Sequence, residues 1–201
     1  MPINNLPDIY FIRHGQTNWN AEGRYQGQKD IALNDFGRAQ AKDNGVLLAD
    51  LFAKNNMKAS DVDWSVSPLS RAIETMDIVQ QAFSSDTNKV QIDNSLIEVS
   101  FGEFEGFLHN DLTSSFAKRG ERGDKFWQFR PKNGESYVDL LDRVTPFITS
   151  LKKPSVIVSH GGIARVFRHL VTNYARVKTI NWSVPQDAIL QFSNAKMKLH
   201  K

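Results

Sequence analysis

The 201-residue sequence contains no cysteine, which excludes disulfide bonds, zinc sites built on thiolates and catalysis by a cysteine nucleophile. Its hydrophobic runs are far too short to span a bilayer, and its first residues do not resemble a signal peptide. It lacks the glycine-rich loops of P-loop and Rossmann proteins, and it has no His-x-His or His-Glu-x-x-His metal motif. These absences predict a cytoplasmic protein that uses no metal and no cofactor.

Charge of one sign is not in large excess either, because 25 Lys and Arg residues against 22 Asp and Glu residues give a net charge of +3. This excess is compatible with an anionic small substrate, with nucleic acid or with neither. A short basic patch contains Lys118, Arg119, Arg122 and Lys125, but two acidic residues interrupt it, as is typical of a solvated helix face. We therefore expect no nucleic-acid partner and no membrane partner.

No internal repeat or Pro/Gly-rich linker divides the chain, so residues 1–201 are predicted to form a single domain. Strand patterns occur near residues 8–13, 63–67, 90–93, 155–159 and 188–193, and helical patterns over residues 36–54, 68–83, 136–151 and 162–171. Their alternation predicts an α/β fold with a parallel sheet covered on both faces. The aromatic, glycine-containing segment of about residues 95–135 is predicted to be a cap over the strand ends.

Individual side chains refine the predicted helices. Residues Phe36, Leu47, Leu48, Leu51 and Phe52 are expected on roughly one face of the helix over 36–54. Ser67 is expected to cap the helix that follows it, with Pro68 in the first turn. Pro146 is expected to kink the helix over 136–151 or to end its first half.

Two histidines follow buried-strand patterns directly. Arg13-His14-Gly15-Gln16-Thr17 comes after the apolar run 9–12, and His160-Gly161-Gly162 comes after the run 156–159. Residues just past the carboxyl ends of parallel strands lie where open α/β sheets bind ligands. Two histidines at one sheet edge, one of them beside an arginine, suggest a site that handles phosphate.

Arg71 is a third candidate at this edge. It lies about one turn into the helix after the strand over 63–67, near the positive helix end that favours anions.

Three carboxylates follow at Glu98, Glu103 and Glu105, in a loop rich in phenylalanine and glycine. A glutamate among Phe101, Phe104 and Phe107 would have its pKa raised by desolvation, which suits a general acid. Glu98 is the preferred candidate and Glu105 the second, and spacing alone does not decide between them.

Other polar and aromatic side chains have more open roles. Glu135 either accepts hydrogen bonds from an active-site arginine or histidine or is simply an acid at a helix amino terminus. Phe101, Phe126, Trp127 and Phe129 are candidates for an apolar specificity pocket, although at least half of them are expected to pack in the core. Arg130 and Lys132 are candidates for a second anionic group, whereas His109, His169 and His200 are interpreted as ordinary surface or core residues.

The motifs occur in a characteristic order between about residues 9 and 165. They are Arg13-His14-Gly15-x-Thr17, Asn20, Arg24-x-Gln26-Gly27, Asp30-x-x-Leu33-x-x-x-Gly37, Ser67-x-x-x-Arg71-x-x-x-Thr75, Glu98, Gly134-Glu135-Ser136 and Ser159-His160-Gly161-Gly162. Together they resemble the histidine phosphatase superfamily, the clan of phosphoglycerate mutase-like phosphatases. The loop Val184–Ala188 departs from the asparagine-containing loop usual there, so no role is transferred to it.

The resemblance implies a three-layer α/β/α sandwich with a mostly parallel sheet and a covalent mechanism without metal. It implies that His14 is the nucleophile and that Arg13, Arg71 and His160 hold the phosphoryl oxygens. Glu98 would protonate the leaving oxygen and then activate water. Contacts with the substrate are expected from Asn20, Thr17, Gln26, Gly27 and Gly161.

A hydrolase is favoured over a mutase within this family. Mutases resemble one another in a longer, arginine-rich acid loop, whereas no arginine adjoins Glu98 here. We predict a histidine acid phosphatase-type phosphomonoesterase that acts on small phosphorylated metabolites through a phosphohistidine on His14. A bisphosphoglycerate-dependent phosphoglycerate mutase is the alternative.

Overall fold

The computed structural model of the chain describes residues 3, 5–83, 87–111 and 124–201. Within these ranges six strands form one sheet in the spatial order β3-β2-β4-β1-β5-β6. The strands are β1 Ile9–Arg13, β2 Asp63–Val66, β3 Val90–Ile92, β4 Ser155–Ser159, β5 Ile189–Ser193 and β6 Lys196–His200. The first four in the spatial order are parallel to one another. At the other edge β5 pairs antiparallel with β1, and β6 pairs antiparallel with β5. The predicted α/β fold with a mostly parallel sheet is confirmed.

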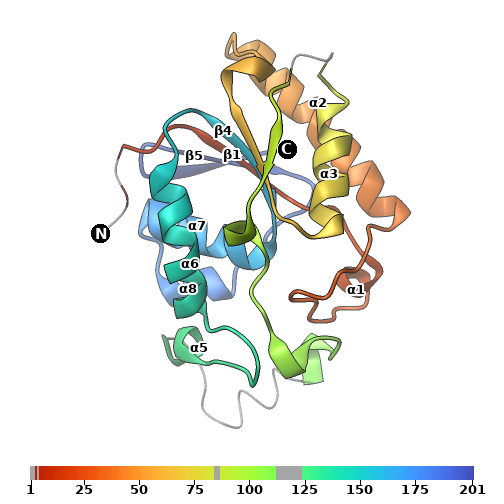
Figure 1. Cartoon of the computed structure of the whole chain (residues 1–201), viewed down its shortest axis with the longest axis vertical. Helices are drawn as coiled ribbons and strands as arrows, with labels where there is room; N and C mark the ends of the chain where they lie inside the picture. Colours follow the sequence, from red (N-terminus) through yellow and green to blue (C-terminus); the bar gives the residue numbers. More distant parts are fainter. Residues whose placement is uncertain (1–2, 4, 84–86, 112–123) are drawn as a thin grey trace.

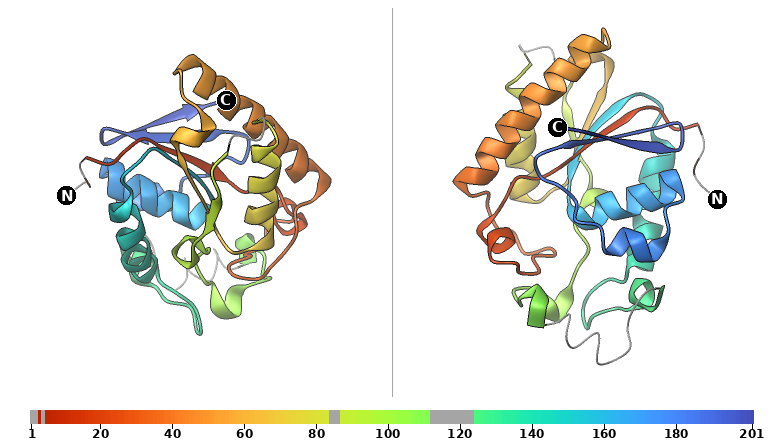
Figure 2. Two further views of the ribbon diagram at one scale, coloured as in Figure 1. Left: turned by 45° about the horizontal axis from the view of Figure 1, so that its top comes forward. Right: turned by 180° about the vertical axis from the view of Figure 1, so that it is seen from behind.

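Helices cover both faces of this sheet (Figure 1). Helices α2 Asp35–Lys54 and α3 Ser70–Gln80 lie on one face, and α6 Tyr137–Ser150 and α7 Gly161–Thr172 lie on the other, as the two further views in Figure 2 also show. Shorter segments connect them: α1 Asn18–Ala21, η1 Ala59–Asp61, η2 Asn94–Leu96, η3 Gly102–Phe104, α5 Asp124–Gln128 and α8 Arg176–Ile180. The arrangement gives the three layers that the sequence predicts.

Alternation along the central strand β1 divides the core in two. Ile9 and Phe11 belong to the cluster that includes buried residues of α6 and α7, whereas Tyr10 and Ile12 belong to the cluster that includes those of α2 and α3. Successive side chains of a strand point to opposite faces, so β1 needs apolar residues at each of its four buried positions, 9–12. This explains why its sequence is a continuous apolar run.

The register between β1 and β4 positions the two histidines. Arg13 and Ser159 are paired at the ends of these parallel strands. The residue directly after each strand is a histidine, His14 after β1 and His160 after β4. The backbone N–H of His14 donates to the carbonyl oxygen of Ser159 at 2.9 Å. The sheet therefore presents both imidazoles at the same edge.

Two local predictions, for Phe36 and for Ser67, were wrong. Phe36 is 61% exposed, because the buried face of α2 is formed by Ala41, Leu48 and other residues that lie about a third of a turn away from it. Helix α3 begins at Ser70, where the carboxylate of Asp30 accepts from the backbone N–H of Ser70 at 2.9 Å, so Ser67 is not its cap. Helix α6 continues through Pro146, so the proline does not end its first half, and the alternative expectation of a kink stays a prediction. The strand β6 was not predicted, and its lysines and Leu199 are exposed at the edge of the sheet.

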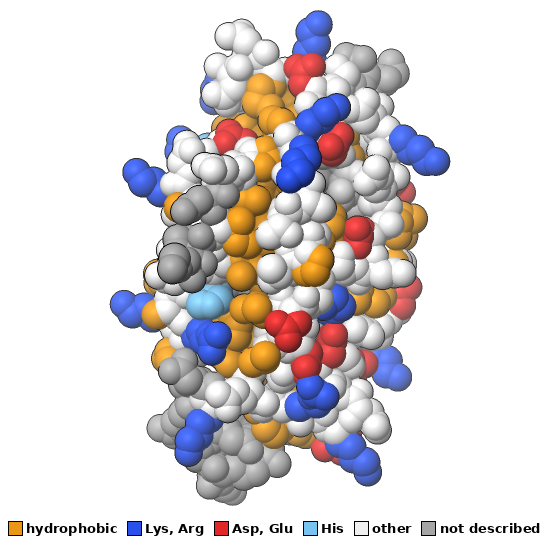
Figure 3. Space-filling view, turned by 60° about the vertical axis from the view of Figure 1, so that its left-hand side comes forward, with side chains coloured by type: hydrophobic (Ala, Val, Ile, Leu, Met, Phe, Trp, Pro, Cys, Tyr) orange, Lys and Arg blue, Asp and Glu red, His pale blue; other side chains and the backbone are white. Residues whose placement is uncertain are grey.

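On the surface of the side that carries α6 and α7, hydrophobic side chains form a narrow strip flanked by charged ones (Figure 3). No helix of the described residues is long and apolar enough to cross a membrane. Lys118, Arg119 and Arg122 of the basic patch lie outside the described residues, and the cap over 95–135 includes residues 112–123, which are not described. The single domain with this cap remains a prediction.

Candidate active site

The two strand-end histidines lie side by side. The ring centroids of His14 and His160 are 5.1 Å apart with an interplanar angle of 60°, and both side chains are buried. They come from segments almost 150 residues apart in the chain, so only the sheet brings them together. The placement agrees with the prediction that two strands deliver both histidines to one site.

Hydrogen bonds define which nitrogen of His14 carries its proton. Nδ1 lies 2.7 Å from the carbonyl oxygen of Gly15, which can only accept, so Nδ1 is the donor. Nε2 lies 3.3 Å from Nε of Arg71, which can only donate, so Nε2 presents its lone pair. Burial, followed by the charges of Arg71 and Arg13, holds the pKa of His14 well below its ordinary value. His14 is therefore a neutral imidazole with an unprotonated Nε2.

Two arginines flank this imidazole. Arg71 is fully buried, and its two terminal nitrogens each donate at 2.8 Å to a backbone carbonyl oxygen, one of Gly27 and one of Lys29. Arg13 donates at 2.7 Å to the carbonyl oxygen of Val184. Burial, followed by the nearby charge of Arg165, lowers the pKa of Arg13 to about 10. Both guanidinium groups are still cationic at neutral pH and are held rigidly by the backbone.

Two polar atoms at this site have no partner among the described residues. They are Nδ1 of His160 and Nε of Arg13, both of which are buried. Buried polar groups are nearly always hydrogen-bonded, so two such atoms at one site call for an explanation. Nε2 of His160, by contrast, lies 2.6 Å from the hydroxyl of Ser67.

The carboxylate of Glu98 is held by backbone donors. It accepts from the N–H of Gly162 at 3.0 and 3.1 Å and from the N–H of Val99 at 2.9 Å. Arg143 fixes the preceding loop by donating to the carbonyl oxygens of Ser95 and Ile97 at 2.8 and 3.0 Å. Of the three phenylalanines expected around this carboxylate, Phe101 lines the same cavity, Phe107 is 53% exposed and Phe104 stacks on Phe129, and a desolvating shell around Glu98 stays a prediction.

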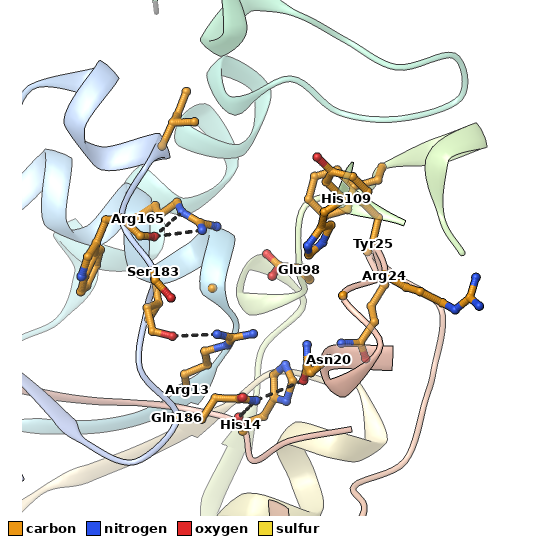
Figure 4. Close-up of a pocket in the computed structure, with 18 of the residues that line it drawn as sticks. Arg13, His14, Asn20, Arg24, Tyr25, Glu98, His109, Arg165, Ser183 and Gln186 are labelled. Atoms are coloured by element: carbon orange, nitrogen blue, oxygen red, sulfur yellow. Dashed lines mark hydrogen bonds between the residues drawn. The ribbon is translucent and has the colours of Figure 1, made fainter. Parts of the chain in front are cut away.

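These side chains line one cavity of about 930 Å³ (Figure 4). Nine of the predicted site residues contribute to it or lie next to it. Arg13, His14, Asn20, Gln26, Gly27, Arg71, Glu98 and Gly161 line the cavity, whereas His160 does not line it and lies next to it, with its ring centroid 5.1 Å from that of His14. The structure therefore brings together almost the whole predicted set.

Thr17, the tenth predicted site residue, makes its side-chain hydrogen bonds with Asn20 and Gln26 rather than with the two histidine rings. It is fully buried, its hydroxyl accepts from the backbone N–H of Asn20 at 3.1 Å and donates to Gln26 at 2.9 Å, and it does not line the cavity. It caps α1 together with Asn20, which accepts in return from the N–H of Thr17 at 3.2 Å. Thr17 thus shapes the loop that carries Asn20 and Gln26 rather than facing a ligand.

The other acidic candidates lie outside the cavity. Oε1 of Glu105 accepts from the backbone N–H groups of Gln28 and Phe101 at 3.0 and 3.1 Å, and Glu103 is exposed. Glu135 forms a two-point ion pair with Arg143 at 3.0 Å for both contacts, so it does accept from an arginine, but from one that supports the Glu98 loop. Glu98 is therefore the one of the three loop carboxylates that faces the histidines.

The aromatic and basic candidates divide in the same way. Phe101 and Phe126 line the cavity, whereas Trp127 is fully buried and its ring nitrogen donates to the carbonyl oxygen of Arg176. Arg130 pairs with Asp139 instead of lining the cavity, and Lys132 does not line it.

The cavity wall also contains residues that were not among the predicted site residues, among them Arg165, Gln186 and His109, which had been interpreted as an ordinary surface or core residue. Arg165 projects from α7 and donates to the carbonyl oxygen of Trp182 at 3.0 and 3.2 Å (Figure 4). Its position one turn into the helix that follows the strand-end histidine His160 was the signal that could have found it. His109 lies on the opposite wall, with its ring centroid 4.3 Å from that of Tyr25. Gln186 donates to the backbone oxygen of His14 at 3.0 Å. Nothing in the sequence near His109 or Gln186 indicated these contacts.

Potential metal ligands do not gather anywhere in the described part of the chain, where no group of three or more histidine and carboxylate side chains could hold a metal ion. The groups that the cavity offers are a neutral imidazole, several cations and one carboxylate. This set can accept an anion, attack it with a nitrogen lone pair and move one proton.

Comparisons with known proteins agree with the motifs. The family model for the histidine phosphatase superfamily (branch 1) matches residues 9–198. Glucosyl-3-phosphoglycerate phosphatase of Mycolicibacterium vanbaalenii is 33% identical over 172 residues, which cover 77% of this chain and 69% of that protein. The 2,3-bisphosphoglycerate-dependent phosphoglycerate mutase of Maricaulis maris is 27% identical over 218 residues, covering 90% and 85%.

A solved structure shows the same fold. The mycobacterial glucosyl-3-phosphoglycerate phosphatase in complex with VO3 superposes with a TM-score of 0.74 at 24% identity, covering 96% of each chain. The family match spans nearly the whole chain, and the residues that carry the motifs meet in one cavity. The chain belongs to the histidine phosphatase superfamily, branch 1.

Proposed function

We propose that the protein is a metal-independent phosphomonoester hydrolase that acts on small phosphorylated metabolites through a phosphohistidine intermediate on His14. The observation that carries the proposal is the state of His14, whose Nε2 lone pair is free of a proton while Arg71 and Arg13 lie beside it. An imidazole can attack phosphorus only in this neutral form. The finer type, a histidine acid phosphatase-type enzyme in the cytoplasm, is part of the same proposal.

In the first step Nε2 of His14 forms a bond to phosphorus, and the bond between phosphorus and the ester oxygen breaks. Charge spreads over the three phosphoryl oxygens, which Arg13, Arg71 and His160 stabilise. The unpartnered Nε of Arg13 and Nδ1 of His160 are donors available for these oxygens. Nδ1 of His14 keeps its proton, and the carbonyl oxygen of Gly15 stabilises the positive charge that the ring acquires.

Glu98 supplies the proton for the leaving oxygen and later accepts one from water. Its carboxylic acid form donates a proton to the leaving ester oxygen, because an alkoxide leaves poorly. The resulting carboxylate then accepts a proton from water, whose oxygen attacks phosphorus and breaks the bond to Nε2 of His14. Inorganic phosphate leaves, and both His14 and Glu98 return to their starting forms.

The rest of the cavity suits a small organic ester. Asn20, Gln26, Gly27 and Gly161 border the region around His14, and the wall farther out combines aromatic and polar side chains, among them Phe101 and Phe126. We infer that these residues contact the alcohol part of the substrate. Thr17 supports the same loop from beneath.

The mutase alternative rests on the relative from Maricaulis maris, whose name is that of a mutase. A mutase must keep the phosphorylated product bound so that it can receive the phosphoryl group again at a second oxygen. The absence of arginine beside Glu98 in the sequence favours release and hydrolysis.

Trapping of the phosphoenzyme tests the proposal. Rapid acid-free quenching with a ³²P-labelled ester should give an acid-labile phosphoprotein in the native enzyme and none in His14→Ala, whereas His200→Ala, which changes a histidine of β6, should label normally. Activity should persist in the presence of a chelator. Normal turnover by His14→Ala would overturn the proposal, and phosphoglycerate interconversion that depends on added bisphosphoglycerate and exceeds hydrolysis would favour the mutase.

A further inference from the structure

Ser67 lies between the end of β2 and the beginning of α3, and its hydroxyl contacts the second histidine of the site. The oxygen is 2.6 Å from Nε2 of His160, and both side chains are fully buried. The two residues are 93 positions apart in the sequence. Since Ser67 is not the cap of α3, its hydroxyl has no evident task in forming that helix.

The single hydrogen of this hydroxyl can be assigned by elimination. The oxygen also lies 3.4 Å from the backbone nitrogen of Leu69, which can only donate, so the oxygen accepts there. Nε2 of His160 is the one contact recorded for Ser67 within the described ranges that could receive its hydrogen. Were Nε2 protonated instead, the buried hydroxyl would be left as a donor without an acceptor, which is costly.

The hydrogen bond from Ser67 affects the tautomer of His160, because this ring is neutral. Burial, then the charges of Arg71 and of the other cations around the site, holds the pKa of His160 well below its ordinary value. The ring is therefore neutral and has one proton to place on two nitrogens. In a neutral imidazole, the hydrogen bond made by one nitrogen decides which of the two is protonated.

The second nitrogen, Nδ1, is the buried atom that lacks a partner. It belongs to a ring whose centroid is 5.1 Å from that of His14, the proposed nucleophile. If Nδ1 carried a lone pair, it would repel the oxygens of a phosphoryl group. If it carries a hydrogen, it donates to one of them.

We propose that Ser67 is a positioning residue whose hydroxyl donates to Nε2 of His160 and thereby holds that ring in the tautomer that presents Nδ1–H to a phosphoryl oxygen. The inference rests on the proposed function, because it takes the anion bound beside His14 to be a phosphoryl group. It explains why a buried serine follows β2 without capping α3. It also explains how His160 acts as a donor without being charged.

The tautomer can be measured without turnover. Protein labelled with ¹⁵N-histidine is examined by NMR without ligand, and the signals of His160 are assigned by comparison with His160→Gln. We expect the native protein to show Nδ1–H at His160 and Ser67→Ala to show a mixture of both tautomers. Binding of inorganic phosphate should weaken about tenfold in Ser67→Ala, the usual order of loss when a supporting hydrogen bond is removed.

Ser65→Ala is the matched control, because Ser65 is a buried serine of β2, two residues before Ser67, and its hydroxyl makes none of these contacts. It should leave both the tautomer and the affinity for phosphate unchanged. Protonated Nε2 in the native protein would overturn the inference even if Ser67→Ala did not fold, and so would native tautomer and affinity in Ser67→Ala. If Nδ1–H is found but no phosphohistidine can be trapped, the proposed function fails while the hydrogen-bond assignment holds.

Discussion

The carboxylate of Glu98 accepts hydrogen bonds from the backbone N–H of Gly162 at 3.0 and 3.1 Å, and so the proposed proton donor is attached to the beginning of α7. The first N–H groups of a helix lack partners within the helix, and a carboxylate satisfies them well. His160 lies two residues before Gly162. The same stretch of chain therefore fixes both the acid and one phosphoryl ligand.

Gly162→Ala is expected to displace the acid. A Cβ atom at this position would lie 2.3 Å from Oε1 of Glu98 and 3.1 Å from Cγ1 of Val99, so the carboxylate would have to move. A displacement of about 1 Å of a reacting group costs roughly 10²-fold in rate. We expect kcat for alkyl phosphates to fall by about that factor while the melting temperature changes little.

A double-mutant cycle separates this effect from general damage to α7. In a Glu98→Gln background the added methyl group has no catalytic acid to displace, so Gly162→Ala should lower kcat little further. Losses that simply multiply in the double variant would show that Gly162 acts independently of Glu98.

Glu98→Gln by itself is expected to reveal the proton that the leaving oxygen needs. General acid catalysis contributes about 10²–10⁴-fold, so hydrolysis of alkyl phosphates should fall within that range. Hydrolysis of p-nitrophenyl phosphate should fall much less, because p-nitrophenolate leaves without a proton. Steady-state rates on the two esters decide the point, and an equal loss on both would exclude Glu98 as the leaving-group acid.

The fold and most of the candidate site could be predicted because both depend on short-range patterns. Buried strands such as β1 and β4 are continuous apolar runs, and the residues directly after them, His14 and His160, must lie at the strand ends. The start of a helix similarly placed Arg71. In each case the position along the chain determines the position at the sheet edge.

Contacts that depend on the path of distant loops could not be predicted. The expectation for Glu98 used its neighbours in sequence, Phe101 and Phe104, but its partner Gly162 is 64 residues away. Tertiary packing also brings His109 and Gln186 to the cavity, from the start of the helical residues 109–111 and from the segment before β5. Residue type alone does not predict which of these residues tertiary packing brings next to the cavity.

Gln186 gives a prediction for the loop to which no role could be assigned. Its side-chain amide donates to the carbonyl oxygen of His14 at 3.0 Å and to Oδ1 of Asn20 at 3.1 Å (Figure 4). Gln186→Ala removes both hydrogen bonds, so kcat/KM should fall about tenfold. Asp187→Ala is the neighbouring control: it removes an exposed ion pair with Lys201, and such pairs contribute little. Equal kcat/KM values for the two variants would show that the amide does not position the site.

Protonation of the two buried histidines should link stability to pH. The pKa values of His14 and His160 are both held well below the ordinary value of 6.5, chiefly by burial. Unfolded histidines titrate near 6.5, so at lower pH the unfolded chain binds protons that the native protein does not. The free energy of unfolding should therefore decrease as the pH falls below about 6.5, by up to about 1.4 kcal/mol per pH unit for each histidine.

Urea unfolding at several pH values between about 5 and 7 measures this slope. His160→Gln provides the comparison, because glutamine fills a similar space and does not titrate. The variant should lose one histidine's share of the decrease, whereas carboxylates elsewhere contribute equally to both proteins and cancel in the difference. Above about pH 7 both histidines are neutral in either state, so the difference between the two proteins should no longer change with pH. Parallel curves down to about pH 5 would mean that His160 already takes up its proton in the native state, and a charged imidazole there would contradict the neutral, Ser67-bound ring.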